Sequence, residues 1–152
     1  MLSRWMMDTN GEVFTKIVLE VFKVSGLLNT EGDQLTEEFG LSSARWKVMG
    51  AIVKADQPVT VSEISRVMGQ SRQATQRVVD VMSKDGLVQL LDNPNHKKAK
   101  LVALTEAGAV VYEKLDRKQE QWAASGAQNI DREELDRALS ALHKMARYLE
   151  RK

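Results

Sequence analysis

The chain has 152 residues, of which 43% are hydrophobic, and a formal net charge of only +1; this length allows one compact unit with a substantial core, extended by a segment that packs against a partner. It contains no cysteine, which excludes disulfides, thiolate zinc sites, iron–sulfur clusters, cysteine nucleophiles and thiol-based redox sensing. The first residues lack the apolar region of a secretory signal, and charges interrupt the apolar runs, so we expect a soluble, cytoplasmic protein without a membrane partner.

Two stripes of apolar residues at helical spacing predict a first helix over residues 13–28. Because this helix is apolar on more than one face, either it forms the centre of a monomer core or one of its faces meets another chain. We expect it to be interrupted or to end at residues 29–33, which include Gly32. Leu35 and Phe39 indicate one further helical turn before Gly40.

A second helix is predicted to begin at Ser42 or Ser43 and to run to about Lys54. Its inward face is expected to consist of Trp46, Met49 or Gly50, and Val53. Trp46 is either a core residue or the border of a ligand cleft, and the core is the simpler assignment.

A short helix is predicted after Pro58, where the chain is broken. Thr60 and Glu63 have the spacing of a capping box at its start, and Gly69 ends it. Its predicted apolar side consists of Val61, Ile64, Val67 and Met68.

The next helix is predicted to run from a cap at Ser71 to about Asp85, with Gly86 as its C-terminal cap. One stripe of it is apolar and comprises Ala74, Val78, Val81 and Met82. The opposite side carries Arg72, Gln73, Gln76, Arg77 and Asp80. Taken alone, this pattern also fits an ordinary amphipathic helix with a solvated side.

The runs LVQLL and KLVAL, at residues 87–91 and 100–104, predict a short two-stranded hairpin. Its tip contains Pro94 and the basic group His96, Lys97, Lys98 and Lys100. Residues 61–104 hold seven Lys and Arg against four Asp and Glu, so the small excess of positive charge lies in this part of the chain. A cationic loop of this kind can follow a phosphate backbone or enter a minor groove.

Two helices are predicted after the hairpin. Thr105 caps the first, which runs to about Ala124, and a turn over residues 123–129 separates it from the last helix. Asp131 and Glu134 have the spacing of a capping box. In the last helix the spacing of apolar residues alternates between four and three at Leu135, Leu139, Leu142, Ala146 and Leu149. This leucine stripe packs either on the chain's own core or on a partner helix, and so regular a terminal stripe favours the partner.

A short helix, a tight turn, a helix with a polar face and a basic hairpin form, in this order, a winged helix-turn-helix. The sequence therefore predicts a mainly α-helical fold with a small two- or three-stranded β-wing. The major groove of B-DNA admits one α-helix, in which Arg can bind guanine and Gln can bind adenine. The predicted DNA-binding residues are Ser71, Arg72, Gln73, Thr75, Gln76, Arg77, His96, Lys97, Lys98 and Lys100.

Residues 41–108 resemble the MarR family of bacterial transcriptional regulators. The resemblance is carried by the helix around Trp46, by PVTVSEIS, by Ser71 with Arg77, by DGLV at residues 85–88 and by LTEAG after the wing. Outside this span the resemblance is topological and consists of an N-terminal helix and two C-terminal helices, which interlock in this family to form a homodimer.

The resemblance implies a homodimeric repressor that binds a pseudo-palindromic operator in double-stranded DNA. Residues 41–104 would form the winged helix-turn-helix, while residues 1–40 and 105–152 would form the dimerisation parts of one interlocked fold. It also implies that DNA is released when a small, often aromatic or anionic, effector fills a cleft between these parts, with Trp46 as a candidate contact.

The tip of the wing departs from the family pattern. Many members carry Asp-x-Arg in the wing, where the aspartate holds an arginine that enters the minor groove, and the corresponding positions here are His96 and Lys98. Lysine lacks the planar fork of arginine, so we expect Lys98, with Lys97, to contribute charge more than groove-width recognition. His96 is either an ordinary exposed histidine or a pH-dependent phosphate donor.

Other functions fit the sequence less well. We expect no enzyme, cofactor or metal site, because the chain has no Gly-rich phosphate loop, and His96 and His143 lie on different elements without further ligands nearby. The alternative function is a winged helix used for protein interaction or dimerisation without DNA binding. Such a protein would expose apolar residues where this chain has Arg72 and its polar neighbours.

Overall fold

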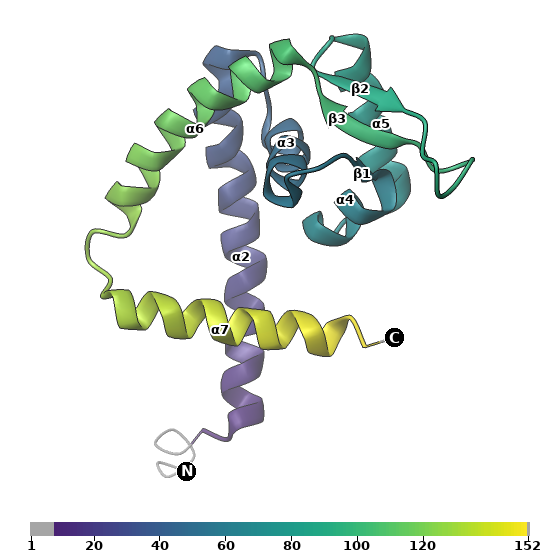
Figure 1. The fold of residues 1–152 in the computed structure, drawn as a ribbon. Coiled ribbons are helices and arrows are strands. Elements are labelled where there is room, and N and C mark those ends of the chain that lie inside the picture. The colour runs from purple at the N-terminus through teal and green to yellow at the C-terminus, as the bar shows by residue number, and fades with distance from the viewer. Residues whose placement is uncertain (1–7, 152) are drawn as a thin grey trace. The chain divides into compact units, whose positions relative to one another are not determined.

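The computed structural model describes residues 8–151 and shows a mainly helical chain with one small three-stranded antiparallel sheet (Figure 1). This confirms the predicted fold class. The described residues form two compact units, one up to Leu115 and the other from Asp116. The elements are α2 (Asn10–Thr36), the 3-10 helix η1 (Glu37–Phe39), α3 (Ser43–Ala55), β1 (Val59–Thr60), α4 (Val61–Met68), α5 (Arg72–Lys84), β2 (Val88–Leu91), β3 (Leu101–Leu104), α6 (Glu106–Gly126) and α7 (Arg132–Leu149). Within residues 8–151, none of the helices has the length and apolar character needed to cross a membrane.

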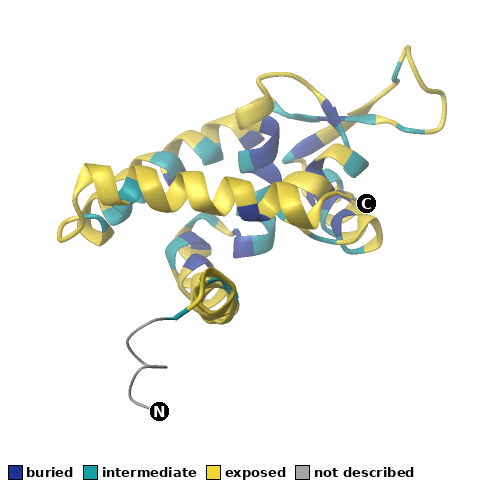
Figure 2. Cartoon of the chain, turned by 90° about the horizontal axis from the view of Figure 1, so that it is seen from below, coloured by how far each residue is buried: buried dark blue, intermediate teal, exposed yellow. Residues whose placement is uncertain are grey.

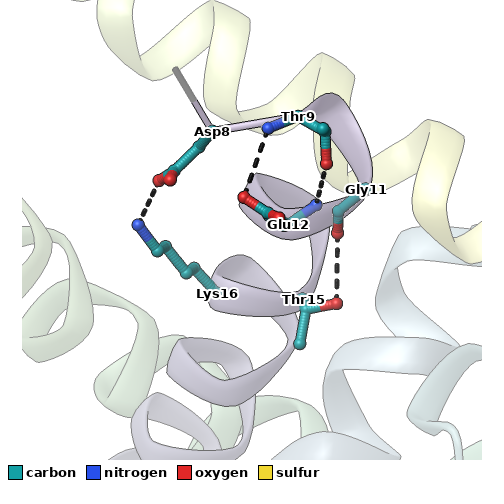
Figure 3. A network of polar contacts seen from close by, with 6 residues as sticks. All are labelled: Asp8, Thr9, Gly11, Glu12, Thr15 and Lys16. Carbon is teal, nitrogen blue, oxygen red and sulfur yellow. Dashed lines mark hydrogen bonds and ion pairs between the residues drawn. The ribbon is translucent and has the colours of Figure 1, made fainter. Parts of the chain in front are cut away.

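Helix α2 begins at a capping box that the sequence patterns did not indicate. The Thr9 hydroxyl accepts from the Glu12 amide at 3.1 Å, and a Glu12 carboxylate oxygen accepts from the Thr9 amide at 3.4 Å (Figure 3). Lys16 donates to Asp8 one turn further along, which ties the residue before the cap to the helix. The two hydrogen bonds of the capping box satisfy amide groups that have no partner within the helix.

The predicted interruption of α2 at residues 29–33 is wrong, because the helix continues to Thr36. Gly32 lowers helix propensity by about 1 kcal/mol relative to alanine, yet it is buried where α2 meets α3. Tertiary packing at this glycine therefore outweighs its local preference. The additional turn predicted before Gly40 is present as η1.

The hydrophobic core of the first unit is formed by residues of α3, α4, α5 and the sheet, with Leu115 of α6. Buried residues are dark blue in Figure 2. The fully buried side chains of this core include Val48, Met49, Ile64, Val79, Met82 and Val102. Three valines predicted to face inward, Val53, Val67 and Val81, are instead 42%, 61% and 45% exposed. In α5 the buried stripe is Thr75, Val79 and Met82, so the helix is rotated by about one residue from the predicted orientation.

The sheet has the strand order β1-β3-β2, with Val59 paired to Val102 and Val88 paired to Leu104. The predicted hairpin is β2 and β3. Strand β1 has only two residues, which is too short to show alternation in the sequence. It links the start of α4 to the wing through main-chain pairing.

Two glycines permit the turns around α5, and a third permits close packing behind the wing. Gly69 and Gly86 have φ values of 66° and 75°, in the left-handed region that glycine adopts without strain, and they end α4 and α5 as predicted. At Gly108 a β-carbon would lie 2.0 Å from the carbonyl oxygen of Leu87. Thr105 caps α6 as predicted, accepting from the Gly108 amide at 3.0 Å.

In the second unit, α6 extends to Gly126, so the turn begins later than predicted. Helix α7 follows an N-cap at Asp131, but the Asp131 side chain makes no capping hydrogen bond, and the predicted capping box is therefore wrong. Of the predicted leucine stripe, Leu139, Leu142 and Leu149 are 55%, 43% and 62% exposed. These three leucines are thus not buried within the second unit.

Candidate nucleic-acid interface

Helices α4 and α5 form a helix-turn-helix with a three-residue turn, residues 69–71. The Gln70 amide donates to the Ser65 carbonyl at 3.0 Å, which closes the end of α4. The Ser71 hydroxyl accepts from the Ala74 amide at 3.1 Å and caps α5 as predicted. Hydrogen bonds on both sides of the turn therefore fix where α5 begins relative to α4.

The outward face of α5 carries four exposed polar side chains from the predicted set, Arg72, Gln73, Gln76 and Arg77. The Gln76 amide nitrogen donates to Asp80 at 2.8 Å, and Arg72 donates to the Ser62 hydroxyl at 3.5 Å. Because Asp80 accepts, its bond turns the amide nitrogen of Gln76 toward it and leaves the carbonyl oxygen available as an acceptor.

Thr75 does not belong to this surface. Its side chain is fully buried, and its hydroxyl donates to the Ser71 carbonyl at 3.0 Å. The inclusion of Thr75 among the contact residues was wrong, because the helix turns this position toward the core. Its hydrogen bond instead supports the first turn of α5.

The wing tip between β2 and β3 has its own hydrogen bonds. The Asn93 side chain accepts from the Asn95 amide at 3.0 Å, and the Asn93 carbonyl accepts from the His96 amide at 3.2 Å. Lys100 forms an ion pair with Asp92 at 3.3 Å. His96, Lys97 and Lys98 are exposed. The backbone turn at Asn93 thus presents three polar side chains beyond the sheet.

Helix α5 and the wing border one cleft of about 730 Å³. Five predicted residues line it, namely Arg72, Gln73, Gln76, Lys98 and Lys100. Ser71, Arg77, His96 and Lys97 are exposed but are not among its lining residues. The lining includes three cations and no carboxylate, so the cleft suits an anionic backbone bordered by hydrogen-bonding groups.

Sequence patterns missed part of this lining, namely Thr60, Val61, Ser62, Leu90 and Ala99. The Thr60 and Glu63 spacing located the start of α4, where the Thr60 hydroxyl accepts from the Glu63 amide at 3.2 Å. Nothing in helical or strand periodicity, however, places that helix start beside the wing. The pairing of β1 with β3 creates this proximity.

Trp46 packs against the hydrophobic core and is partly buried. A β-carbon added to Gly32 would lie 3.6 Å from its ring, which puts Trp46 near the end of α2. This position agrees with its assignment to the core, while a contact with an effector stays a prediction.

Comparisons with known proteins agree with this fold. The sequence profile described as MarR family matches residues 39–99. The uncharacterized protein Rv2011c of Mycobacterium tuberculosis is 32% identical over 103 residues, which is 68% of this chain and 71% of that protein.

Solved structures are similar over most of the chain. A mutant of MarR from Escherichia coli, complexed with operator DNA, is 25% identical with a TM-score of 0.66, over 84% of this chain and 94% of that chain. CouR from Rhodococcus jostii RHA1, bound to p-coumaroyl-CoA, is 18% identical with a TM-score of 0.76, over 86% of this chain and 91% of that chain. The chain therefore belongs to the MarR family of DNA-binding transcriptional regulators.

Proposed function

We propose that this protein is a homodimeric, sequence-specific transcriptional repressor that binds a pseudo-palindromic operator and releases it when a small molecule binds. It would act by binding rather than by catalysis, in the cytoplasm. The observation that carries the proposal is the cleft that joins the polar face of α5 to the lysines of the wing. A surface for protein interaction would have apolar side chains at its centre, whereas the face of α5 that lines this cleft presents Arg72, Gln73 and Gln76.

In the proposed complex, α5 lies in the major groove, where Arg72, Gln73, Gln76 and Arg77 contact base edges. Ser71, at the start of the helix, contacts the backbone. His96, Lys97, Lys98 and Lys100 contact phosphates beside the adjacent minor groove. Among the described residues, Lys97 and Lys98 have no ion-pair partner in the chain. These lysines therefore need not break an ion pair with a carboxylate before they bind DNA.

The proposed homodimer would bury the apolar faces of α2 and α7, within residues 1–40 and 105–152. Leu19, Phe22 and Leu27 of α2 are 63%, 71% and 60% exposed. Three leucines of α7, Leu139, Leu142 and Leu149, are also exposed. So many large, exposed apolar side chains are uncommon on a monomer surface. A second copy of the chain would cover them.

The proposed effector is a small molecule, by analogy with the structurally similar CouR, which is bound to p-coumaroyl-CoA. Trp46 is its candidate contact in this chain. The effector's identity would be found by measuring which small molecules lower the protein's affinity for its operator.

Selection of bound duplexes from a random pool tests the proposal. We expect a consensus with two-fold symmetry whose half-sites are centred about one helical turn apart, roughly 10 base pairs, or a multiple of it. A pool that shows no enrichment after repeated rounds would contradict sequence-specific binding and favour the protein-interaction alternative. An enriched site without symmetry would contradict the homodimer.

A further inference from the structure

We infer that Asp33 is a positioning residue for operator recognition: its carboxylate joins the end of α2 to the start of α3 and fixes the direction of α2 relative to the winged helix. The inference rests on the proposed homodimer, since the direction of α2 matters for DNA binding only if α2 carries a dimer contact. It would make the selectivity for half-site spacing depend on a residue outside the DNA-binding surface.

The contact itself is a helix cap supplied by another helix. Asp33 Oδ1 accepts from the Ser43 amide at 2.8 Å, and Ser43 is the first residue of α3. The hydroxyl of Ser42, the N-cap of α3, accepts from the Arg45 amide at 3.3 Å, and the Ser42 carbonyl accepts from the Trp46 amide at 2.9 Å. Asp33 therefore satisfies an amide group at the positive end of α3 that the local cap leaves open. The hydrogen bonds from Ser43 lower the pKa of Asp33, because they favour its charged carboxylate.

The two backbones are also in close contact at this point. Gly32 is buried, and a β-carbon there would lie 2.9 Å from the β-carbon of Ser43. Thr36 is fully buried one turn later, and its hydroxyl donates to the Gly32 carbonyl at 2.7 Å. The junction therefore has little space in which α2 can slide or tilt toward α3.

A second polar contact lies one turn before Asp33. Lys47 of α3 donates to the Asn29 side chain at 2.6 Å. Asn29, Gly32, Asp33 and Thr36 are spaced so that they share one face of α2. Directional hydrogen bonds on this face, together with the close packing at Gly32, set the angle between the helices.

Because α2 is long, a small change in its angle to α3 would move its N-terminal end by a large distance. All of residues 19–31 are exposed in the structure, so the fixed part of the helix is its C-terminal end. At 1.5 Å per residue, α2 extends about 35 Å from Asp33 toward its first residue, and a tilt of about 10° would move that end by about 6 Å. DNA rises 3.4 Å per base pair along one strand, so such a tilt corresponds to nearly two base pairs.

The experiment measures affinity for duplexes in which the two selected half-sites are separated by spacers changed in single base pairs. Wild type should prefer one spacing. Asp33→Ala should reduce the preference for that spacing over its neighbours by about three- to tenfold, which corresponds to the loss of one hydrogen bond of ordinary net strength. Affinity for an isolated half-site should not change, because no base or phosphate contact is altered.

Matched variants separate positioning from general destabilisation. Gln34→Ala changes the adjacent exposed residue of α2 and should keep the wild-type spacing profile. Asp33→Asn retains an acceptor oxygen and should restore most of the selectivity. Gly32→Ala keeps the carboxylate but forces α2 away from Ser43, so it should shift the preferred spacing, and it provides the test if Asp33→Ala does not fold.

The outcomes distinguish failure of the proposed role of Asp33 from failure of the proposed homodimer. A spacing profile of folded Asp33→Ala that superimposes on that of Gln34→Ala would overturn the role of Asp33. The same holds if Gly32→Ala leaves the profile unchanged. If wild type itself binds two spaced half-sites no more tightly than one, the homodimer of the proposed function fails instead.

Discussion

Single side chains at this site have roles that depend on their hydrogen-bond partners. Gln76 and Arg77 are both exposed on α5. The side-chain amide of Gln76 is held by a 2.8 Å hydrogen bond to Asp80. The oxygen that remains available matches the exocyclic amine of adenine or cytosine, which donates in the major groove. Asp80 is thus expected to influence base preference without touching DNA.

Gln76→Ala should relax base preference at one position of each operator half-site, by about 1 to 3 kcal/mol, because one specific contact is removed. Fluorescence anisotropy with the operator, single-base variants and a random duplex would measure this. Asp80→Ala should change preference at the same position by allowing the amide to turn. Equal losses of affinity for operator and random duplex would show that Gln76 contacts the backbone instead.

Gly108→Ala should destabilise the fold. The new β-carbon would be 2.0 Å from the Leu87 carbonyl oxygen, and this backbone cannot move without disturbing the pairing of Val88 with Leu104. We expect urea unfolding to show a loss of about 1 to 3 kcal/mol, or more. Gly26→Ala is the control, since no atom lies within 4 Å of its added β-carbon, and it should be neutral or stabilising by up to about 1 kcal/mol. Equal stability of the two variants would contradict the packing argument.

At the scale of elements, local signals predicted what local chemistry controls. The sequence predicted the caps at Thr60 and Ser71 and the glycines after α4 and α5. Each cap accepts a hydrogen bond from an amide a few residues away, and each glycine ends the helix directly before it. The continuation of α2 through Gly32 and the strand β1 were not found. Both depend on partners far along the chain, as does the cleft between α5 and the wing.

The sequence also did not determine which face of α5 is buried. Periodicity identified an apolar stripe on α5 but chose Val81 over Val79, although Val79 is fully buried and Val81 is 45% exposed. Adjacent valines on a short helix give the pattern two phases about 100° apart. The packing of Thr75 and Met82 decides between them, and this choice also removed Thr75 from the predicted DNA contacts.

The wing should act as an electrostatic element. Lys97→Ala/Lys98→Ala should weaken binding to operator and random duplexes by similar factors and reduce the slope of log affinity against log salt by about two, at roughly 0.9 per phosphate contact. Lys54→Ala/Lys114→Ala removes the same charge from exposed positions outside the cleft and should leave the slope nearly unchanged. Identical slopes for the two double variants would exclude the wing from phosphate binding.

At the scale of the molecule, packing within each unit does not explain the exposed apolar side chains of α2 and α7. The sequence offered two interpretations of each stripe, burial in the chain's own core or contact with a partner. In the structure Phe22 and Leu139 are 71% and 55% exposed, so neither is buried in the core of its own unit. Helix periodicity alone could not distinguish these cases, because both place apolar residues on one face.

Removal of residues 131–152 should therefore convert the proposed dimer into monomer or aggregate, as measured by light scattering. Leu139→Glu/Leu142→Glu tests the same face without shortening the chain. In a two-fold interface each leucine occurs twice, and four buried leucines at about 1.5 to 3 kcal/mol each contribute at least roughly 6 kcal/mol, so the dissociation constant should rise by about 10⁴ or more. Glu133→Ala/Arg137→Ala, at exposed charged positions of the same helix, should leave the mass unchanged. A native dimer in both the truncated chain and the leucine variant would show that α7 makes no essential dimer contact, and α2 would then be the remaining candidate.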